Sequence, residues 1–90
     1  MRVLIVNYNA FILKIQIALV KNLTSNVFAV ESGAQAISFL QHEQVDIVLM
    51  DMQMPEMDGV ETTKRIRQFN SQIPIIAVTG NDSLPDRQNV

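Results

Sequence analysis

The chain has 90 residues, of which 48% are hydrophobic and 18% charged, and its formal net charge is −2. A chain of this length forms one small domain. It contains no cysteine, which excludes disulfides and zinc-thiolate sites, and no apolar stretch reaches the roughly 18 residues of a membrane span. Its first residues lack the pattern of a signal peptide, so we expect a soluble cytoplasmic protein with no membrane partner.

Strand and helix signals alternate along the chain, with short connections between them. We expect strands at 3–6, 27–30, 46–51 and 74–78. We expect helices from Ala10 to about Leu23, from an N-cap at Ser32 through Leu40, and from an N-cap at Asp58 to Phe69. Because right-handed crossovers place helices on both faces of a parallel sheet, this order predicts an α/β fold.

The first predicted helix carries apolar side chains around nearly its whole circumference. They are Phe11, Ile12, Leu13, Ile15, Ile17, Ala18, Leu19, Val20 and Leu23. A helix that is apolar on all sides is normally covered on more than one side. The sheet can cover one side of this helix, but the sequence offers no obvious cover for the other.

The segment from Val45 to Gly59, VDIVLMDMQMPEMDG, is the most informative part of the chain. Its apolar run ends at a single carboxylate, Asp51, and a methionine-rich loop and an Asp58-Gly59 turn follow. A strand that is apolar on both faces belongs in the middle of a covered parallel sheet. Asp51 therefore lies at the carboxyl end of that strand, where open α/β sheets bind ligands and carry out chemistry.

Four segments together resemble the receiver domain of two-component response regulators and hybrid histidine kinases. They are the VLIV opening, SGAQAI, LMDMQMPEMDG and IPIIAVTG, and the resemblance covers nearly the whole chain. It implies a flavodoxin-like, three-layer α/β/α parallel sheet of strand order 2-1-3-4 that lacks the fifth βα unit, so residues 1–90 would be an incomplete receiver domain. It also implies that Asp51 is the phosphoacceptor and that Thr79 contacts the phosphoryl group and couples it to a conformational switch.

The same resemblance implies a Mg²⁺ site, but the sequence departs from the receiver pattern there. Receivers bind the metal through an acidic pair after the first strand, the phosphoacceptor, and a backbone carbonyl two residues beyond it, here that of Gln53. The acidic pair falls at Asn7 and Tyr8, and an amide or a phenol is a weak ligand for a hard cation. Asp51 would be the only carboxylate, so we expect weak Mg²⁺ binding or none.

The receiver lysine that pairs with the phosphoryl group also has no equivalent here, because Lys14, Lys21 and Lys64 all fall on predicted helices. We therefore expect a phosphorelay module in which Asp51 accepts a phosphoryl group inefficiently from a histidine kinase or a phosphotransfer protein. The alternative is a pseudo-receiver or receiver fragment that acts through protein contacts or dimerisation without phosphorylation.

Other functions fit the residues less well. An aspartate-nucleophile phosphohydrolase typically carries a general acid two residues after the nucleophile, where Gln53 cannot transfer a proton. A dinucleotide site would need glycines after the first strand. We therefore expect no enzymatic activity. The basic residues Lys64, Arg65 and Arg67 follow Glu61 on one predicted helix, which favours a salt-bridged face over direct nucleic-acid binding.

The resemblance also bears on assembly. In receivers the first helix packs between the sheet and the fifth helix, and the fourth strand is flanked by the fifth. Without those elements, the outer side of the first helix and the edge of the strand at 74–78 would be exposed. We therefore expect a homo-oligomer, most simply a two-fold dimer formed by helix packing, edge pairing or an exchanged element. The alternative is that the chain is a fragment and that the missing segment supplies the cover.

Overall fold

The computed structural model of the chain describes residues 1–78. Strands and helices alternate as β1 (Arg2–Val6), α1 (Ala10–Val20), β2 (Asn26–Val30), α2 (Gly33–His42), β3 (Ile47–Asp51), α3 (Gly59–Arg67) and β4 (Ile75–Val78). The predicted alternation is confirmed, but two helices end earlier than predicted. α1 ends at Val20 rather than near Leu23, and α3 ends at Arg67 before Phe69.

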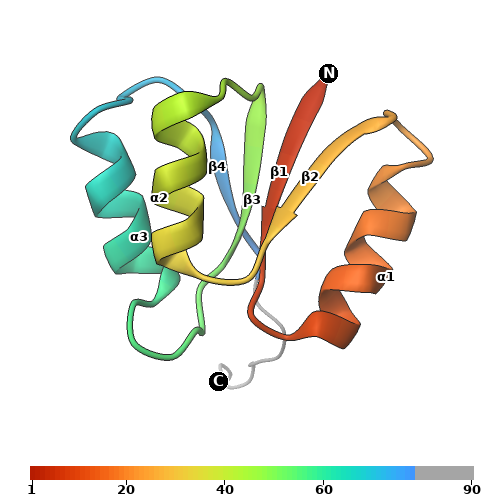
Figure 1. The fold of residues 1–90 in the computed structure, drawn as a ribbon, viewed down its shortest axis with the longest axis horizontal. Helices are drawn as coiled ribbons and strands as arrows, with labels where there is room; N and C mark the ends of the chain where they lie inside the picture. The colour runs from red at the N-terminus through yellow and green to blue at the C-terminus, as the bar shows by residue number, and fades with distance from the viewer. Residues whose placement is uncertain (79–90) are drawn as a thin grey trace, which may run out of the picture.

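The four strands form one parallel sheet in the order β2-β1-β3-β4, which confirms the predicted order (Figure 1). The two central strands are β1 and β3, and their register pairs Val6 with Met50. Helices follow β1, β2 and β3 and return the chain to the start of the next strand. This is the flavodoxin-like arrangement, with all four strands ending at the same edge of the sheet.

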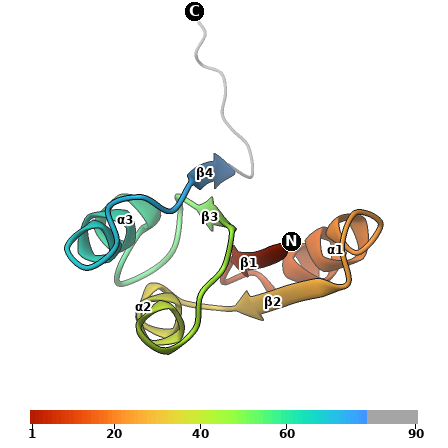
Figure 2. The same ribbon diagram turned by 90° about the horizontal axis from the view of Figure 1, so that it is seen from above.

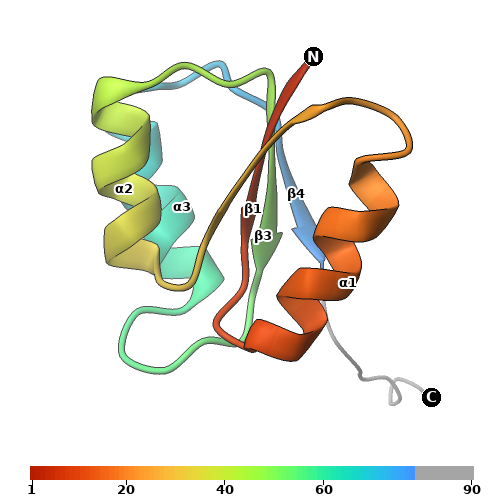
Figure 3. The same cartoon turned by 45° about the vertical axis from the view of Figure 1, so that its right-hand side comes forward.

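The helices lie on both faces of the sheet, which gives three layers. α1 stands on one face, and α2 and α3 lie side by side on the other (Figures 2 and 3). The core beneath α2 and α3 consists of Leu4, Val6, Ala36, Leu40, Val48, Met50, Met54, Ile66 and Ile73. The smaller core beneath α1 consists of Val3, Ile5 and Leu13, with half-buried apolar residues packed against it. Alternate residues of β1 therefore point to opposite faces, as the pleat of a strand requires.

Polar side chains cap the three helices of residues 1–78 at their first turns. The Asn9 side chain accepts hydrogen bonds from the backbone N–H groups of Phe11 and Ile12 at the start of α1. Ser32 and Asp58 cap α2 and α3, as predicted from the sequence. These caps satisfy N–H groups that have no partner within a helix, so each helix starts at a defined residue after its strand.

The outer side of α1 is apolar and exposed. Phe11 is 72% exposed, Ile15 45% and Leu19 62%, and Leu23 just beyond the helix is 86% exposed. The sheet covers only the opposite side of α1, where Leu13 is buried. Within residues 1–78, α1 thus lacks a second cover, as the sequence indicated. No helix in this part of the chain is long and apolar enough to cross a membrane.

Candidate functional site

Asp51 is the last residue of β3 and is 7% exposed. Its Oδ1 accepts a hydrogen bond of 3.0 Å from the backbone N–H of Gln53, two residues along the loop. β3 is flanked by β1 and β4, and the register pairs Asp51 with Val78. The carboxylate is therefore held in a fixed orientation at the carboxyl edge of the sheet, where the sequence predicted it.

Asn7 follows β1 directly and lies level with Asp51, because the register pairs the preceding residues, Val6 and Met50. Asn7 is 5% exposed, and both ends of its amide are engaged. Its Oδ1 accepts from the backbone N–H of Asn9 at 2.9 Å, and its Nδ2 donates to Oε1 of Gln16 at 3.4 Å. Asn7 thus ties the end of β1 to the cap and the second turn of α1.

The donor set at this edge does not fit a complete Mg²⁺ site. A hard divalent cation takes oxygen ligands, and carboxylates are the usual protein donors. Within residues 1–78 there is no group of three or more His, Cys, Asp or Glu residues placed to hold a metal ion. Asp51 offers one carboxylate, and the Asn7 amide oxygen already accepts a backbone hydrogen bond. Tyr8 is 51% exposed. That Tyr8 or the Gln53 carbonyl serves as a metal ligand stays a prediction.

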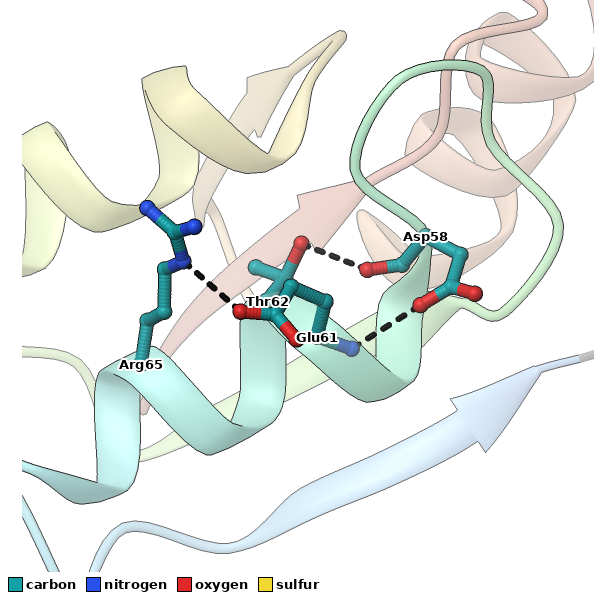
Figure 4. Close-up of polar contacts among 4 residues, drawn as sticks. All are labelled: Asp58, Glu61, Thr62 and Arg65. Atoms are coloured by element: carbon teal, nitrogen blue, oxygen red, sulfur yellow. Dashed lines mark hydrogen bonds and ion pairs between the residues drawn. The ribbon is translucent and has the colours of Figure 1, made fainter.

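The loop after β3 is anchored at its far end by the first turn of α3 (Figure 4). The Asp58 side chain accepts from the backbone N–H of Glu61 at 2.9 Å, and the Thr62 hydroxyl donates to the Asp58 carbonyl at 2.8 Å. Arg65 pairs with Glu61 at 2.9 Å, which confirms a salt bridge on the face predicted to carry one. Arg67 differs, since its Nη1 donates to the carbonyls of Asn70 and Ile73.

Gly59 is the point of closest approach between α3 and the end of β3. A Cβ at this position would lie 2.5 Å from the Asp51 carbonyl oxygen and 2.7 Å from Cα of Met52. The Gly59 N–H also donates to the Met52 carbonyl at 3.2 Å. Only glycine therefore allows the helix to start this close to the strand that carries Asp51.

Glu56 in the same loop has a φ of 68°, in the left-handed region that glycine adopts at no steric cost. We expect Glu56→Gly to raise the free energy of unfolding by about 0.5–1 kcal/mol, since the steric relief exceeds the entropy that glycine adds to the unfolded chain. Chemical denaturation at a fixed protein concentration measures this. Glu56→Ala, which retains Cβ, is the matched control and should change stability little. Equal stabilities of the glycine and alanine variants would contradict the account.

The structure thus brings Asp51 and Asn7 to one edge and leaves Tyr8 half exposed beside them. Thr79 lies outside the described residues. Three residues that shape the surroundings of Asp51 and Asn7 were not predicted from the sequence. They are Asn9, which caps α1, Gln16, which is the hydrogen-bond partner of Asn7, and Gly59, which contacts the backbone behind Asp51. An asparagine directly before a helix is a cap signal that was available, whereas the Gln16 and Gly59 contacts depend on the tertiary fold.

A parallel sheet of this order, with a buried carboxylate ending a central strand, defines a flavodoxin-like domain with its site at the carboxyl edge. The sequence profile of the response regulator receiver domain matches residues 3–90. The chain belongs to the response regulator receiver domain family, the regulatory modules of phosphorelay systems.

Two curated relatives illustrate the similarity. The chemotaxis protein CheY of Bacillus subtilis is 43% identical over 76 residues, which cover 83% of this chain and 63% of that protein. The sensor histidine kinase GacS of Pseudomonas protegens is 39% identical over 85 residues, which cover 89% of this chain and 9% of the kinase. The chain therefore spans less than a tenth of the length of that kinase.

A solved structure shows the same fold with higher coverage. It is the receiver domain of the histidine kinase CKI1 from Arabidopsis thaliana, complexed with Mg²⁺ and BeF₃⁻. It superposes with a TM-score of 0.78 at 32% identity, and the match covers 96% of this chain and 70% of that one. The fold and family predicted from the sequence are confirmed.

Proposed function

We propose that this receiver domain accepts a phosphoryl group on Asp51 from a phosphohistidine of a histidine kinase or a phosphotransfer protein. The observation that carries the proposal is the buried Asp51 carboxylate at the end of β3, oriented through the N–H of Gln53. Within the described residues, its Oδ2 accepts no hydrogen bond, so one oxygen has a lone pair available for attack. We also propose that Thr79 contacts the phosphoryl group. Residues 1–90 are proposed to form an incomplete receiver unit.

The proposed step is a direct transfer between nitrogen and oxygen. A carboxylate oxygen of Asp51 attacks phosphorus, and the bond from phosphorus to the donor imidazole nitrogen breaks. The electron pair stays on the ring nitrogen, which takes up a proton, and an acyl phosphate forms on Asp51. The reaction brings negative charge onto negative charge, and within residues 1–78 no group of three or more His, Cys, Asp or Glu residues is placed to hold a cation that would offset it. We therefore propose that transfer is slow and that Mg²⁺ binding is weak or absent.

The alternative function is contact without phosphorylation. The amide of Asn7 favours it, because both ends of this side chain are used to hold α1 and the loop before it. A buried amide in this position maintains the local structure without contributing a charge. In that case Asp51 would serve the structure of the β3–α3 loop only, and partners would recognise the surface of the domain.

Labelling with small phosphoryl donors tests the proposal on the 90-residue chain. We expect acetyl phosphate or phosphoramidate to add one phosphoryl group slowly to the wild-type chain, as read by intact mass. Asp51→Asn should abolish the labelling. Asp58→Asn is the matched control, because asparagine also caps a helix, and it should be labelled like the wild type.

Two results would contradict the phosphoacceptor role. Labelling that persists in Asp51→Asn would place the phosphoryl group elsewhere. A wild-type chain that resists both donors, and whose amide shifts near Asp51 do not respond to beryllofluoride with Mg²⁺, would favour the contact-only alternative. Saturation by Mg²⁺ at low millimolar concentration would contradict the proposal that Mg²⁺ binding is weak or absent.

We also propose that the chain forms a homodimer. The support is the exposed apolar side of α1 together with the position of β4 at the edge of the described sheet. An unpaired strand edge and an exposed apolar helix side are both features that proteins normally cover. A cytoplasmic location and the lack of direct nucleic-acid binding stay predictions.

A further inference from the structure

The side chains of Asn7 and Asp51 face the same side of the sheet at its carboxyl edge. Val6 and Met50 are register partners, and both belong to the core beneath α2 and α3. Because successive residues of a strand point to opposite faces, Asn7 and Asp51, which follow them, point to the α1 side. The hydrogen bond from Asn7 to Gln16 of α1 agrees with this orientation. Neighbouring strands are about 4.7–4.9 Å apart, so a group bonded to the Asp51 carboxylate lies within reach of the Asn7 amide.

The orientation of the Asn7 amide is set by a backbone group that can only donate. The N–H of Asn9 donates to this side chain at 2.9 Å, so the atom that faces it is the carbonyl oxygen, Oδ1. The NH₂ group therefore lies at the other end of the amide, where Nδ2 donates to Oε1 of Gln16 at 3.4 Å. An NH₂ group carries two hydrogens, and within residues 1–78 only one of them has an acceptor. The Asn7 amide thus retains one N–H that can donate to a group on Asp51.

This amide suits a phosphoryl group better than a cation. Its oxygen is the atom that could ligate a metal ion, and it already accepts the hydrogen bond from Asn9. Its remaining N–H carries partial positive charge, which repels a cation and attracts the negatively charged oxygens of a phosphoryl group. The amide is only 5% exposed and is held by two hydrogen bonds, so it is already in place before a phosphoryl group arrives. Donors that are fixed in this way stabilise developing negative charge without reorganisation during the reaction.

We propose that the second N–H of Asn7 donates to a phosphoryl oxygen during transfer to Asp51, and that this hydrogen bond supports the reaction without a divalent cation. This inference rests on the proposed phosphorylation of Asp51 and makes Asn7 a catalytic residue for it. A carboxylate oxygen of Asp51 attacks phosphorus, and the bond from phosphorus to the donor nitrogen breaks. That nitrogen keeps the electron pair and takes up a proton from water. Asn7 transfers no proton and only holds its hydrogen bond to the phosphoryl oxygen.

Phosphoramidate, whose P–N bond is of the same kind as that of phosphohistidine, tests the dependence on a cation. The rate of labelling of the 90-residue chain is followed by intact mass, in excess EDTA and in millimolar Mg²⁺. We expect the wild-type chain to be labelled at rates that agree within about twofold under the two conditions, because the transfer does not pass through a bound cation.

Asn7→Asp separates the donor from the rest of the side chain. An aspartate oxygen still accepts from the N–H of Asn9, but a charged oxygen replaces the NH₂ group. We expect the labelling rate in EDTA to fall by about 100-fold, as on the loss of one donor to developing negative charge. Millimolar Mg²⁺ should restore part of this rate, because carboxylates are its usual protein ligands. Asn9→Ser is the matched control, since it removes a neighbouring amide while serine still caps α1, and it should be labelled like the wild type.

Asn7→Ala removes the donor without adding a charge. We expect it to be labelled about 10–100-fold more slowly than the wild type in EDTA, with no recovery in Mg²⁺. Circular dichroism establishes that it is folded. If it is not, the side-chain amide protons of Asn7 in the wild type carry the test. On labelling in EDTA, one of the two should shift downfield, whereas the one that is bonded to Gln16 should change little.

The outcomes separate the role of Asn7 from the phosphorylation of Asp51. A wild-type chain that is labelled on Asp51 only in the presence of Mg²⁺ overturns this inference and retains the proposed function. Labelling of Asn7→Asp in EDTA at the wild-type rate, or Asn7 amide protons that do not respond to labelling, overturns the donor role. A wild-type chain that resists every phosphoryl donor under both conditions overturns the inference and the proposed function together.

Discussion

Replacing Asn7 and Tyr8 together by aspartate is expected to raise the affinity for Mg²⁺ by about 10²–10³-fold. Each added carboxylate about 4 Å from a divalent cation contributes about 2 kcal/mol even with the full screening of water, and two contribute about 4 kcal/mol. Asn7 lies level with Asp51, so a carboxylate there joins the one that is already present. We also expect labelling of Asp51 by acetyl phosphate to become faster, because a bound cation offsets the charge of the incoming group.

The local structure should tolerate the change at Asn7. Its Oδ1 accepts from the N–H of Asn9, and an aspartate oxygen can accept the same bond. Its Nδ2 now donates to Oε1 of Gln16, and this bond is lost. Rotation of the Gln16 amide by a half turn presents its NH₂ group to the new carboxylate instead. The double variant should therefore fold with stability within about 1 kcal/mol of the wild type.

Amide shifts during a Mg²⁺ titration measure the affinity, and intact mass follows the labelling. Asn9→Asp is the matched control, since it also turns an amide into a carboxylate near this edge, and aspartate keeps the cap of α1. Because its oxygen remains bonded to the N–H groups of Phe11 and Ile12, this variant should gain little affinity. An unchanged Mg²⁺ affinity in the double aspartate variant would show that Asn7 and Tyr8 do not line the metal position.

The part of the site on β3 was predictable because local and global signals agree there. The run before Asp51 is apolar on both faces, which only a central covered strand accommodates, and the structure gives β3 neighbours on both sides. The same holds for the caps at Ser32 and Asp58, where a polar residue precedes an apolar helical pattern. Each of these features is encoded within a few residues.

The features that the sequence did not predict depend on contacts between distant segments. α1 ends at Val20 because the following residues form the return to β2, where the Thr24 hydroxyl donates to the Met1 carbonyl at 2.6 Å. The apolar pattern continues to Leu23 and carries no sign of that contact. The bond between Asn7 and Gln16 likewise joins residues nine positions apart through the packing of α1 on β1. Such pairings follow from the fold and not from the local pattern.

Gly59→Ala is expected to lower the free energy of unfolding by about 2–3 kcal/mol, the upper range of overpacking costs. Gly59 is the first residue of α3, and helix propensity alone would predict a gain of up to about 1 kcal/mol from alanine. Overpacking and helix propensity therefore predict changes of opposite sign in the free energy of unfolding. The added Cβ would meet the carbonyl oxygen of Asp51 at 2.5 Å and Cα of Met52 at 2.7 Å. These are backbone atoms, which cannot rotate away, so α3 or the end of β3 must move.

Gly33→Ala is the matched control, because Gly33 is also the first residue of its helix, α2. There the added Cβ would meet the side chains of Thr62 and Met57 and not the backbone. Thr62→Ala should therefore relieve most of the cost of Gly33→Ala, whereas no single side-chain truncation should relieve that of Gly59→Ala. Unfolding is followed by chemical denaturation at one fixed protein concentration, since a dimer would make stability depend on it.

The same variant connects stability to the site. A displaced junction between β3 and α3 moves the backbone of Asp51 and Met52, and with it the N–H of Gln53 that orients the Asp51 carboxylate. We therefore expect Gly59→Ala to perturb the amide shifts of Asp51 and Gln53 and to reduce labelling of Asp51 under conditions where the variant is folded. A Gly59→Ala chain as stable as the wild type, with unchanged shifts at Asp51, would show that α3 does not begin against the strand that carries Asp51.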